Sequence, residues 1–163
     1  MRPLARSVVA LAVLSLSAAS LGAQQRARRL DGGWRLVRDQ VTTPDSTFVP
    51  ALSNGRLVIS GRYYSQIFLR PAAPGVQQAS APSAIEEKAA RYDLVTANAG
   101  TLDVGDGQLT FHIEQAKVPQ IMGTASVRPY RLKGDTLWIT ATRPSMSDST
   151  KTVRTVSTYV RDR

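Results

Sequence analysis

Short segments in which apolar and polar residues alternate recur along the chain, separated by glycine, proline and polar residues. Alternation with a period of two is typical of strands that bury one face. In the first segment, Trp34 and Leu36 share one face. Arg35 and Asp39 lie on the opposite face. The pattern predicts strands at residues 34–41, 55–60, 62–70, 101–104, 108–116, 124–132, 135–142 and 152–161.

Turn residues between these segments favour pairing of neighbouring strands. Tight turns are indicated at Gly61, at Gly105-Asp106-Gly107 and at Lys133-Gly134. A polar loop at 42–54 contains a short stretch, 47–49, that is compatible with brief pairing. The sequence therefore predicts an all-β fold with one helix, an eight-stranded antiparallel up-and-down barrel, and a β-sandwich is the alternative.

One helix interrupts the strands. Ser83 and Glu86 form a capping box directly after Pro82, and the helix is predicted to run to about Asn98. Residues 92–96 are also compatible with the start of a strand. Four apolar residues at helical spacing give the helix a narrow face to bury: Ile85, Ala89, Tyr92 and Val95. We predict a lid over a barrel mouth, and the alternative is a fixed element on the outer wall.

The N-terminal segment has the layout of a secretory signal peptide. Arg2 and Arg6 precede an uncharged, mostly apolar run at 7–19, and small residues follow. We predict a signal peptide at 1–23 with cleavage after Ala23, and Ser20 and Gly22 are alternative cleavage positions. The chain has no cysteine, so it offers neither a lipid-attachment thiol nor a disulfide. The expected location is secreted or periplasmic, with a disordered basic tail at 24–29 and one domain at 30–163.

The charge balance adds an expectation about partners. The chain has 21 basic and 12 acidic residues, and removal of the signal leaves 19 basic residues. These are spread out and lack the single-face clustering with aromatic residues that is typical of nucleic-acid sites. The sequence therefore predicts no nucleic-acid partner. A basic surface favours anionic partners such as lipid head groups or cell-envelope polymers.

Several short motifs resemble the bacterial lipocalin-like domain family of calycin barrels. They are Gly32-Gly33-Trp34-Arg35-Leu36-Val37, Gly55-Arg56-Leu57, Tyr63-Tyr64-Ser65, His112-Ile113-Glu114, Gly123, Val127-Arg128, Gly134-Asp135-Thr136-Leu137 and Arg161. The resemblance implies a barrel that binds a small apolar ligand, and it implies no particular reaction. It also implies that Trp34 packs under Arg161 in a cation–π contact that closes one barrel end. Pro129 departs from the family pattern, because proline within a strand indicates a bulge or an exposed edge.

Four polar residues are the candidate ligand-binding site: His112, Glu114, Arg128 and Tyr130. A turn centred near Ile121 would place Glu114 opposite Arg128 and His112 opposite Tyr130. Arg128 and Tyr130 would then bind a ligand carboxylate or phosphate by charge-assisted hydrogen bonds. One alternative is a self-satisfied buried pair of Arg128 and Glu114. Another is a one-residue shift in which His112 and Glu114 lie on the surface and the interior is apolar.

The sequence is compatible with three functions. The first is an exported carrier whose barrel holds a small, largely apolar molecule with a carboxylate or phosphate head. The second is an interaction module of the cell envelope without a small-molecule site. The third is an enzyme that uses His112 and Glu114 for acid–base chemistry. A single histidine and the lack of cysteine disfavour a metal site, no Gly-x-Ser-x-Gly motif supports a hydrolase, and no cofactor is predicted.

Overall fold

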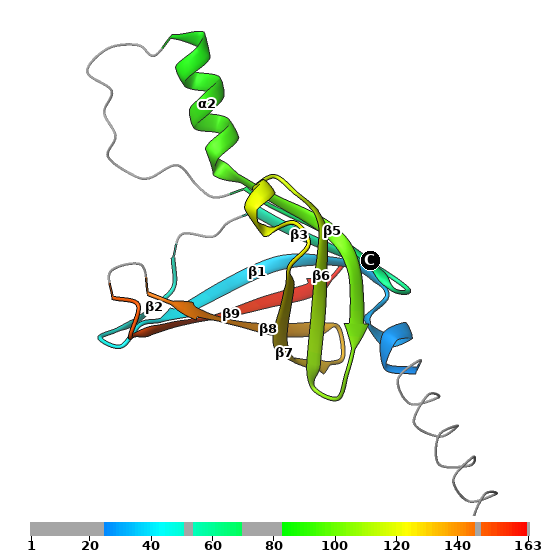
Figure 1. Ribbon diagram of the computed structural model, residues 1–163. Coiled ribbons are helices and arrows are strands. Elements are labelled where there is room, and N and C mark those ends of the chain that lie inside the picture. The colour runs from blue at the N-terminus through cyan, green and yellow to red at the C-terminus, as the bar shows by residue number, and fades with distance from the viewer. Residues whose placement is uncertain (1–24, 51–53, 70–82, 146–147, 163) are drawn as a thin grey trace, which may run out of the picture.

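The computed structural model describes residues 25–50, 54–69, 83–145 and 148–162. Most of these residues belong to antiparallel strands (Figure 1). The elements are β1 (Gly32–Thr42), β2 (Thr47–Phe48), β3 (Asn54–Ser60), β4 (Tyr63–Leu69), α2 (Ala84–Leu94), β5 (Val95–Val104), β6 (Gln108–Ala116), the 3-10 helix η1 (Pro119–Ile121), β7 (Ala125–Lys133), β8 (Thr136–Pro144) and β9 (Thr152–Arg161). The predicted signal peptide lies outside the described residues.

The strands form a closed antiparallel barrel with up-and-down connections. Each strand from β3 to β9 pairs with the next one along the chain, and β1 closes the ring by pairing with both β3 and β9. The short strand β2 adds to β1 outside this ring. The barrel that the alternating pattern predicts is therefore confirmed, and the sandwich alternative is wrong.

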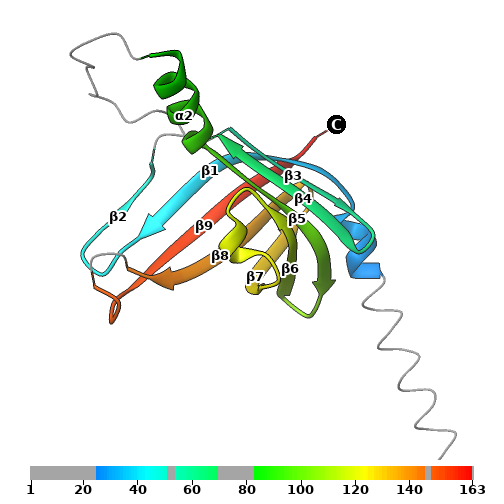
Figure 2. The same cartoon turned by 45° about the horizontal axis from the view of Figure 1, so that its top comes forward.

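Within the ring, the β1–β3 and β7–β8 ladders are short. Both pair their strands only near one end of the barrel. β1 pairs with β3 over four residue pairs that end at Arg35 and Arg56, although β1 continues to Thr42. β7 pairs with β8 over four residue pairs that end at Tyr130 and Ile139. Strands β8, β9 and β1 therefore diverge from strands β3 to β7 toward the other end, which we call the mouth (Figures 1 and 2).

Alternation along the strands separates an apolar interior from a polar outer wall. In β3 the buried residues Gly55, Leu57 and Ile59 alternate with exposed ones. The buried core comprises Leu30, Trp34, Leu36, Leu57, Ile59, Tyr64, Leu102, Leu109, Phe111, Leu137, Ile139 and Tyr159. Burial of apolar surface is the main favourable term in folding, so these core residues stabilise the barrel.

Trp34 and Arg161 close the end of the barrel opposite the mouth. They are cross-strand partners, and the Arg161 guanidinium carbon lies 4.2 Å from the centre of the Trp34 ring. The indole Nε1 donates to the Leu30 carbonyl at 2.8 Å, and the guanidinium donates to the carbonyls of Asp31 and Arg29. The buried indole and the cation together tie β1, β9 and the preceding segment into one unit.

The segment before β1 differs from the disordered tail predicted at 24–29. Residues 25–30 are helical. Leu30 is fully buried at the closed end, and Arg26 lies 3.2 Å from the Asp106 carboxylate in the β5–β6 turn. The charge of the segment suggested disorder, but the buried leucine and its carbonyl, which accepts from Trp34, hold it against the barrel.

Helix α2 begins with the predicted capping box. The Ser83 hydroxyl accepts from the Glu86 backbone, and the Glu86 carboxylate accepts from the Ser83 backbone at 2.8 Å. The helix ends at Leu94, earlier than predicted, because Val95 has extended dihedral angles and begins β5.

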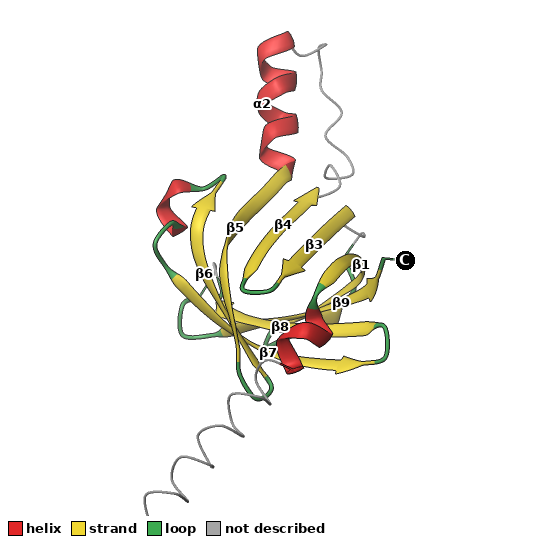
Figure 3. Cartoon of the chain, turned by 90° about the vertical axis from the view of Figure 1, so that its right-hand side faces the viewer, coloured by secondary structure: helices red, strands yellow, loops and turns green. Residues whose placement is uncertain are grey.

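Among the described residues, the predicted apolar face of α2 is largely exposed. The helix projects away from the barrel (Figure 3). Ile85 is 80% exposed, Tyr92 is 59% exposed, Ala89 is exposed, and Val95 belongs to β5. Neither a closed lid nor packing on the outer wall describes this arrangement. Movement of α2 onto the mouth stays a prediction.

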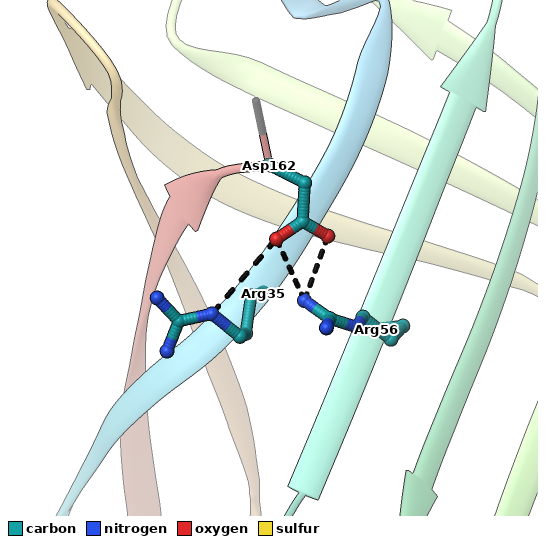
Figure 4. A network of polar contacts seen from close by, with 3 residues as sticks. All are labelled: Arg35, Arg56 and Asp162. Carbon is teal, nitrogen blue, oxygen red and sulfur yellow. Dashed lines mark hydrogen bonds and ion pairs between the residues drawn. The ribbon is translucent and has the colours of Figure 1, made fainter.

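A carboxylate after the last strand joins β1 and β3 on the outer wall. Arg35 and Arg56 are direct cross-strand partners, so their like charges oppose each other. Asp162 lies between them (Figure 4). Its carboxylate accepts from Arg56 at 2.7 Å and lies 3.8 Å from the Arg35 Nε. All three side chains are about half exposed, so this network relieves repulsion and adds little stability.

Candidate functional site

The interior changes character toward the mouth. Most apolar residues near the closed end are buried, with Val104, Tyr130 and Leu132 partly buried, whereas several inward residues of the mouth half, most of them polar or charged, retain partial exposure. These are Asp39, Phe68, Ser126, Arg128, Ala141, Thr155 and Ser157. Since an inward side chain keeps exposure only where solvent reaches it, the mouth half of the interior is accessible from outside. This half is the candidate site.

The predicted pairing between β6 and β7 is wrong. Arg128 pairs with Leu109, and His112 pairs with Ala125. The connection is asymmetric, because β6 continues to Ala116 and is followed by η1 before β7 begins. The prediction assumed a turn centred near Ile121 and did not account for these additional residues of β6. Arg128 and Glu114 therefore do not form the expected pair.

His112 lies on the outer wall. Its Nε2 is 2.8 Å from the Asp103 carboxylate on β5, and its side chain is 43% exposed. The inward residues of β6 are Leu109, Phe111 and Ile113, as in the alternative with an apolar interior. The acid–base hypothesis required His112 to face the cavity, so it is dropped.

Glu114 is the extra residue of a β-bulge. The β5–β6 ladder shifts between Ala99 and Gly100, which pair with Gln115 and Ile113. A side chain at Gly100 would place its Cβ 1.9 Å from the His112 carbonyl oxygen, so glycine permits the close approach of the strands there. Glu114 itself is exposed, and its charge raises the pKa of the inward Tyr64.

Arg128 faces the interior from β7, as the alternation of this strand predicted. Its Nε donates to the Ser126 hydroxyl at 3.1 Å, and its guanidinium carbon lies 5.0 Å from the centre of the Phe111 ring. Burial lowers the pKa of Arg128, but arginine remains charged in proteins. Within the described part of the chain, no carboxylate lies at ion-pair distance from this guanidinium.

Two tyrosines share the electrostatic environment of Arg128. The Tyr64 ring packs edge-on against Phe111 with centroids 4.8 Å apart, and its buried hydroxyl has no hydrogen-bond partner among the described residues. Burial raises the pKa of Tyr64, and the charge of Arg128 opposes that rise. Burial also raises the pKa of Tyr159, and Asp39 adds to the rise. Both phenols are therefore neutral donors at physiological pH.

Asp39 is the acidic residue that faces this space from the β1 side. The Ser157 hydroxyl donates to its carboxylate at 2.6 Å, across the β1–β9 ladder. Asp39 forms no ion pair with Arg128 within the described residues. The two charges therefore stand on different strands, β1 and β7, and each has a serine hydroxyl as a hydrogen-bond partner.

Tyr130 does not join Arg128. It lies nearer the closed end, beside a hollow of about 290 Å³ whose lining includes Arg26, Arg29 and Arg131. Burial is the main cause that raises the pKa of Tyr130. Of the four predicted ligand-binding residues, the structure thus places only Arg128 firmly inside the mouth half.

Three further residues of the site, Tyr64, Tyr159 and Asp39, were not among the residues that the sequence predicted for it. Alternation within 63–69 already places Tyr64, Gln66 and Phe68 on one face, so Tyr64 was accessible to the same reasoning as Arg128. Alternation could not identify Asp39, because a bulge between Leu36 and Arg38 turns its side chain inward. Gln66 donates to Asn98 at 2.8 Å, and this buried pair satisfies itself.

No group of three or more potential metal ligands occurs among the described residues. Within the same residues, no helix is long and apolar enough to cross a membrane. A family model described as a lipocalin-like domain matches residues 31–161. The chain belongs to the lipocalin-like domain family. No curated protein and no solved structure matches it. The lipocalin-like match spans every strand of the barrel and connects this site with a fold associated with ligand binding.

Proposed function

We propose that the barrel binds a small, largely apolar molecule with an anionic head group, and that Arg128 holds this head. The supporting observation is the inward guanidinium of Arg128, which has no carboxylate partner among the described residues. A partly buried cation without a counter-ion is costly, and an anionic ligand removes that cost. A carboxylate or a phosphate would serve, because both accept two parallel bonds from a guanidinium.

The surroundings of Arg128 favour an amphiphile over a small inorganic anion. The Phe111 ring lies beside the guanidinium, the Tyr64 ring packs against Phe111, and Ile113 and Phe68 face the interior. The Tyr64 hydroxyl supplies an unused neutral donor. The ligand head would therefore meet Arg128 and Tyr64, and its apolar part would lie against the aromatic and aliphatic side chains of the mouth half.

The test compares an acid with its neutral ester. Dansylaminoundecanoic acid and its methyl ester share an apolar chain and fluorophore, and they differ in the charge that Arg128 would bind. Arg128→Gln should weaken binding of the acid about 10- to 100-fold, as expected for a hydrogen bond to a charged group, and should change binding of the ester little. Arg62→Gln is the matched control, because it removes an equal charge from the turn between β3 and β4.

Two results would contradict the proposal. One is equal binding of acid and ester by the unmodified protein. The other is an Arg128→Gln protein that keeps its affinity for the acid. Thermal unfolding of each variant separates a lost site from a lost fold, and removal of an unpaired cation should not lower the melting temperature.

We further propose that the protein is exported and acts in the periplasm or outside the cell. Support comes from the basic start, the apolar run at 7–19 and the small residues that follow. N-terminal sequencing of protein recovered from the periplasm should find a chain that begins after Ala23, Gly22 or Ser20. Recovery of the intact chain from the cytoplasm alone would contradict export.

A further inference from the structure

Three adjacent strands of the barrel carry basic residues and no acidic ones. β7, β8 and β9 contain no aspartate or glutamate. Their basic residues are Arg128, Arg131, Lys133, Arg143, Arg154 and Arg161. Arg128 faces the interior and Arg161 closes the barrel end. Arg131, Lys133 and Arg154 are exposed, so the outer wall of these strands is positively charged.

A shallow hollow lies on this wall, where the β7–β8 ladder stops. The ladder ends at Tyr130 and Ile139, and β8 continues beyond it. Pro129 comes next to Tyr130 on β7 and has no amide hydrogen to donate. The hollow has a volume of about 300 Å³ and is lined by Pro129, Tyr130, Arg131, Trp138, Thr140, Arg154 and Val156. The exposed strand edge that the sequence predicted at Pro129 therefore borders this hollow.

The side chains of the hollow suit an anion that also carries hydroxyl groups. The Arg131 guanidinium carbon lies 4.0 Å from the centre of the Trp138 ring, so a cation–π contact with the indole positions the guanidinium at the hollow. Neither Arg131 nor Arg154 forms an ion pair within the described residues. Threonines face outward beside them on β8, at Thr136, Thr140 and Thr142.

A second hollow lies next to the first one, toward the closed end. The second hollow, of about 290 Å³, shares Tyr130 and Arg131 with the first and adds Arg26 and Arg29. Of these, Arg26 has the exposed Asp106 as a partner. The two hollows share lining residues and together include four arginines, so they form an extended strip, which fits several units of a chain better than a single small anion.

We propose that this strip, defined by Arg131, Trp138, Thr140 and Arg154 with Arg26 and Arg29 at its end, binds an acidic polysaccharide. Acidic sugars offer carboxylates to the guanidinium groups and hydroxyls to the threonines. A lipid surface fits less well, because Val127 is the one exposed large hydrophobic residue on β7, β8 and β9 in the described chain. The strip lies outside the barrel, so it is independent of the ligand site at Arg128.

The test measures binding of the protein to immobilised polygalacturonate, with neutral dextran as the control polymer. The double variant R131Q/R154Q should raise Kd for polygalacturonate about tenfold or more, since each arginine contributes charge-assisted bonds. R62Q/K88Q is the matched control, because it removes the same charge from the β3–β4 turn and from α2. This control should change Kd less than about twofold, and salt should weaken binding of the unmodified protein.

Each alternative outcome overturns a defined part of the proposal. Equal losses in both double variants would show that binding follows net charge and not the strip. Failure to bind polygalacturonate, together with binding to anionic phosphatidylglycerol vesicles or single-stranded DNA, would show that the partner class is wrong. Binding of dansylaminoundecanoic acid should persist in R131Q/R154Q, so failure here leaves the interior site unaffected.

Discussion

Arg128 and Arg131 lie three residues apart on β7 and face opposite sides of the barrel wall. Arg128 contacts Phe111 inside, and Arg131 stacks on Trp138 outside. Each guanidinium is held by an aromatic ring, and neither has a carboxylate partner in the described structure. Because strand residues alternate between faces, one short segment serves two surfaces that meet different molecules.

Tyr64→Phe is expected to separate stability from binding. The Tyr64 hydroxyl is buried without a partner, so its removal should leave the free energy of unfolding unchanged or raise it by about 1 kcal/mol. The same change should weaken dansylaminoundecanoic acid binding about fivefold, since it removes a donor worth roughly 1 kcal/mol. Urea unfolding and fluorescence titration measure the two effects. A loss of stability above about 1 kcal/mol would mean that the hydroxyl is satisfied in the free protein.

Gly100→Ala is expected to disrupt the bulge that positions Glu114. The new Cβ would lie 1.9 Å from the His112 carbonyl oxygen and 2.9 Å from the Glu114 nitrogen, and both are backbone atoms. The free energy of unfolding should fall by about 3 kcal/mol, at the upper end of the usual cost of overpacking. Gly105→Ala is the control, because its nearest contact would be 3.4 Å. Similar urea midpoints for both variants would argue against the close approach of β5 and β6.

For single residues, the sequence predicted which faces of a strand are buried but not where bulges occur. Arg128 and Tyr64 follow simple alternation, and their inward orientation is readable from the chain. Asp39 follows one bulge and Glu114 is the extra residue of another, and the alternation shifts by one residue at each. A bulge at Gly100 depends on how closely another strand approaches, which the local pattern does not record.

At the scale of elements, α2 illustrates the difference between a local and a tertiary signal. Its start was predictable, because the capping box involves residues only three positions apart. The packing of α2 was not predictable, because the exposed Ile85 and Tyr92 have helical spacing whether or not another surface covers them. The β6–β7 register failed for a related reason. β6 extends beyond its paired residues and is followed by the 3-10 helix η1, so the β6–β7 connection is asymmetric and its midpoint does not give the register.

The capping box predicts a pH dependence of the α2 N-terminus. Hydrogen bonds from Ser83 lower the pKa of Glu86, so the ionised carboxylate stabilises the helix. This contribution is complete above the ordinary glutamate pKa and is lost as the pH falls through the lowered pKa of the folded state. NMR titration should therefore give Glu86 a lower midpoint in the unmodified protein than in Ser83→Ala, which removes the side-chain partner. Equal Glu86 midpoints in the two proteins would contradict the capping box.

At the scale of the whole molecule, the barrel divides into a packed end and an accessible end. Strand number, order and sense were predictable, because alternation and tight turns are local features of each hairpin. The short β1–β3 and β7–β8 ladders were not predictable, since they depend on how two groups of strands diverge. That divergence opens the mouth half, where Arg128 is accessible, and leaves the closed half to the apolar core.

Because the barrel has a packed end and an accessible end, we expect substitutions at the packed end to change stability and to leave the ligand site intact. Trp34→Ala should lower the free energy of unfolding by about 3–5 kcal/mol, because Trp34 is fully buried and its indole contacts both Arg161 and Leu30. Arg161→Gln should cost about 1–2 kcal/mol through the lost cation–π contact. Both proteins should bind dansylaminoundecanoic acid with nearly unchanged Kd at temperatures where they remain folded. The opposite pattern, in which Arg161→Gln weakens ligand binding as strongly as Arg128→Gln, would place the ligand near the closed end and refute an independent mouth half.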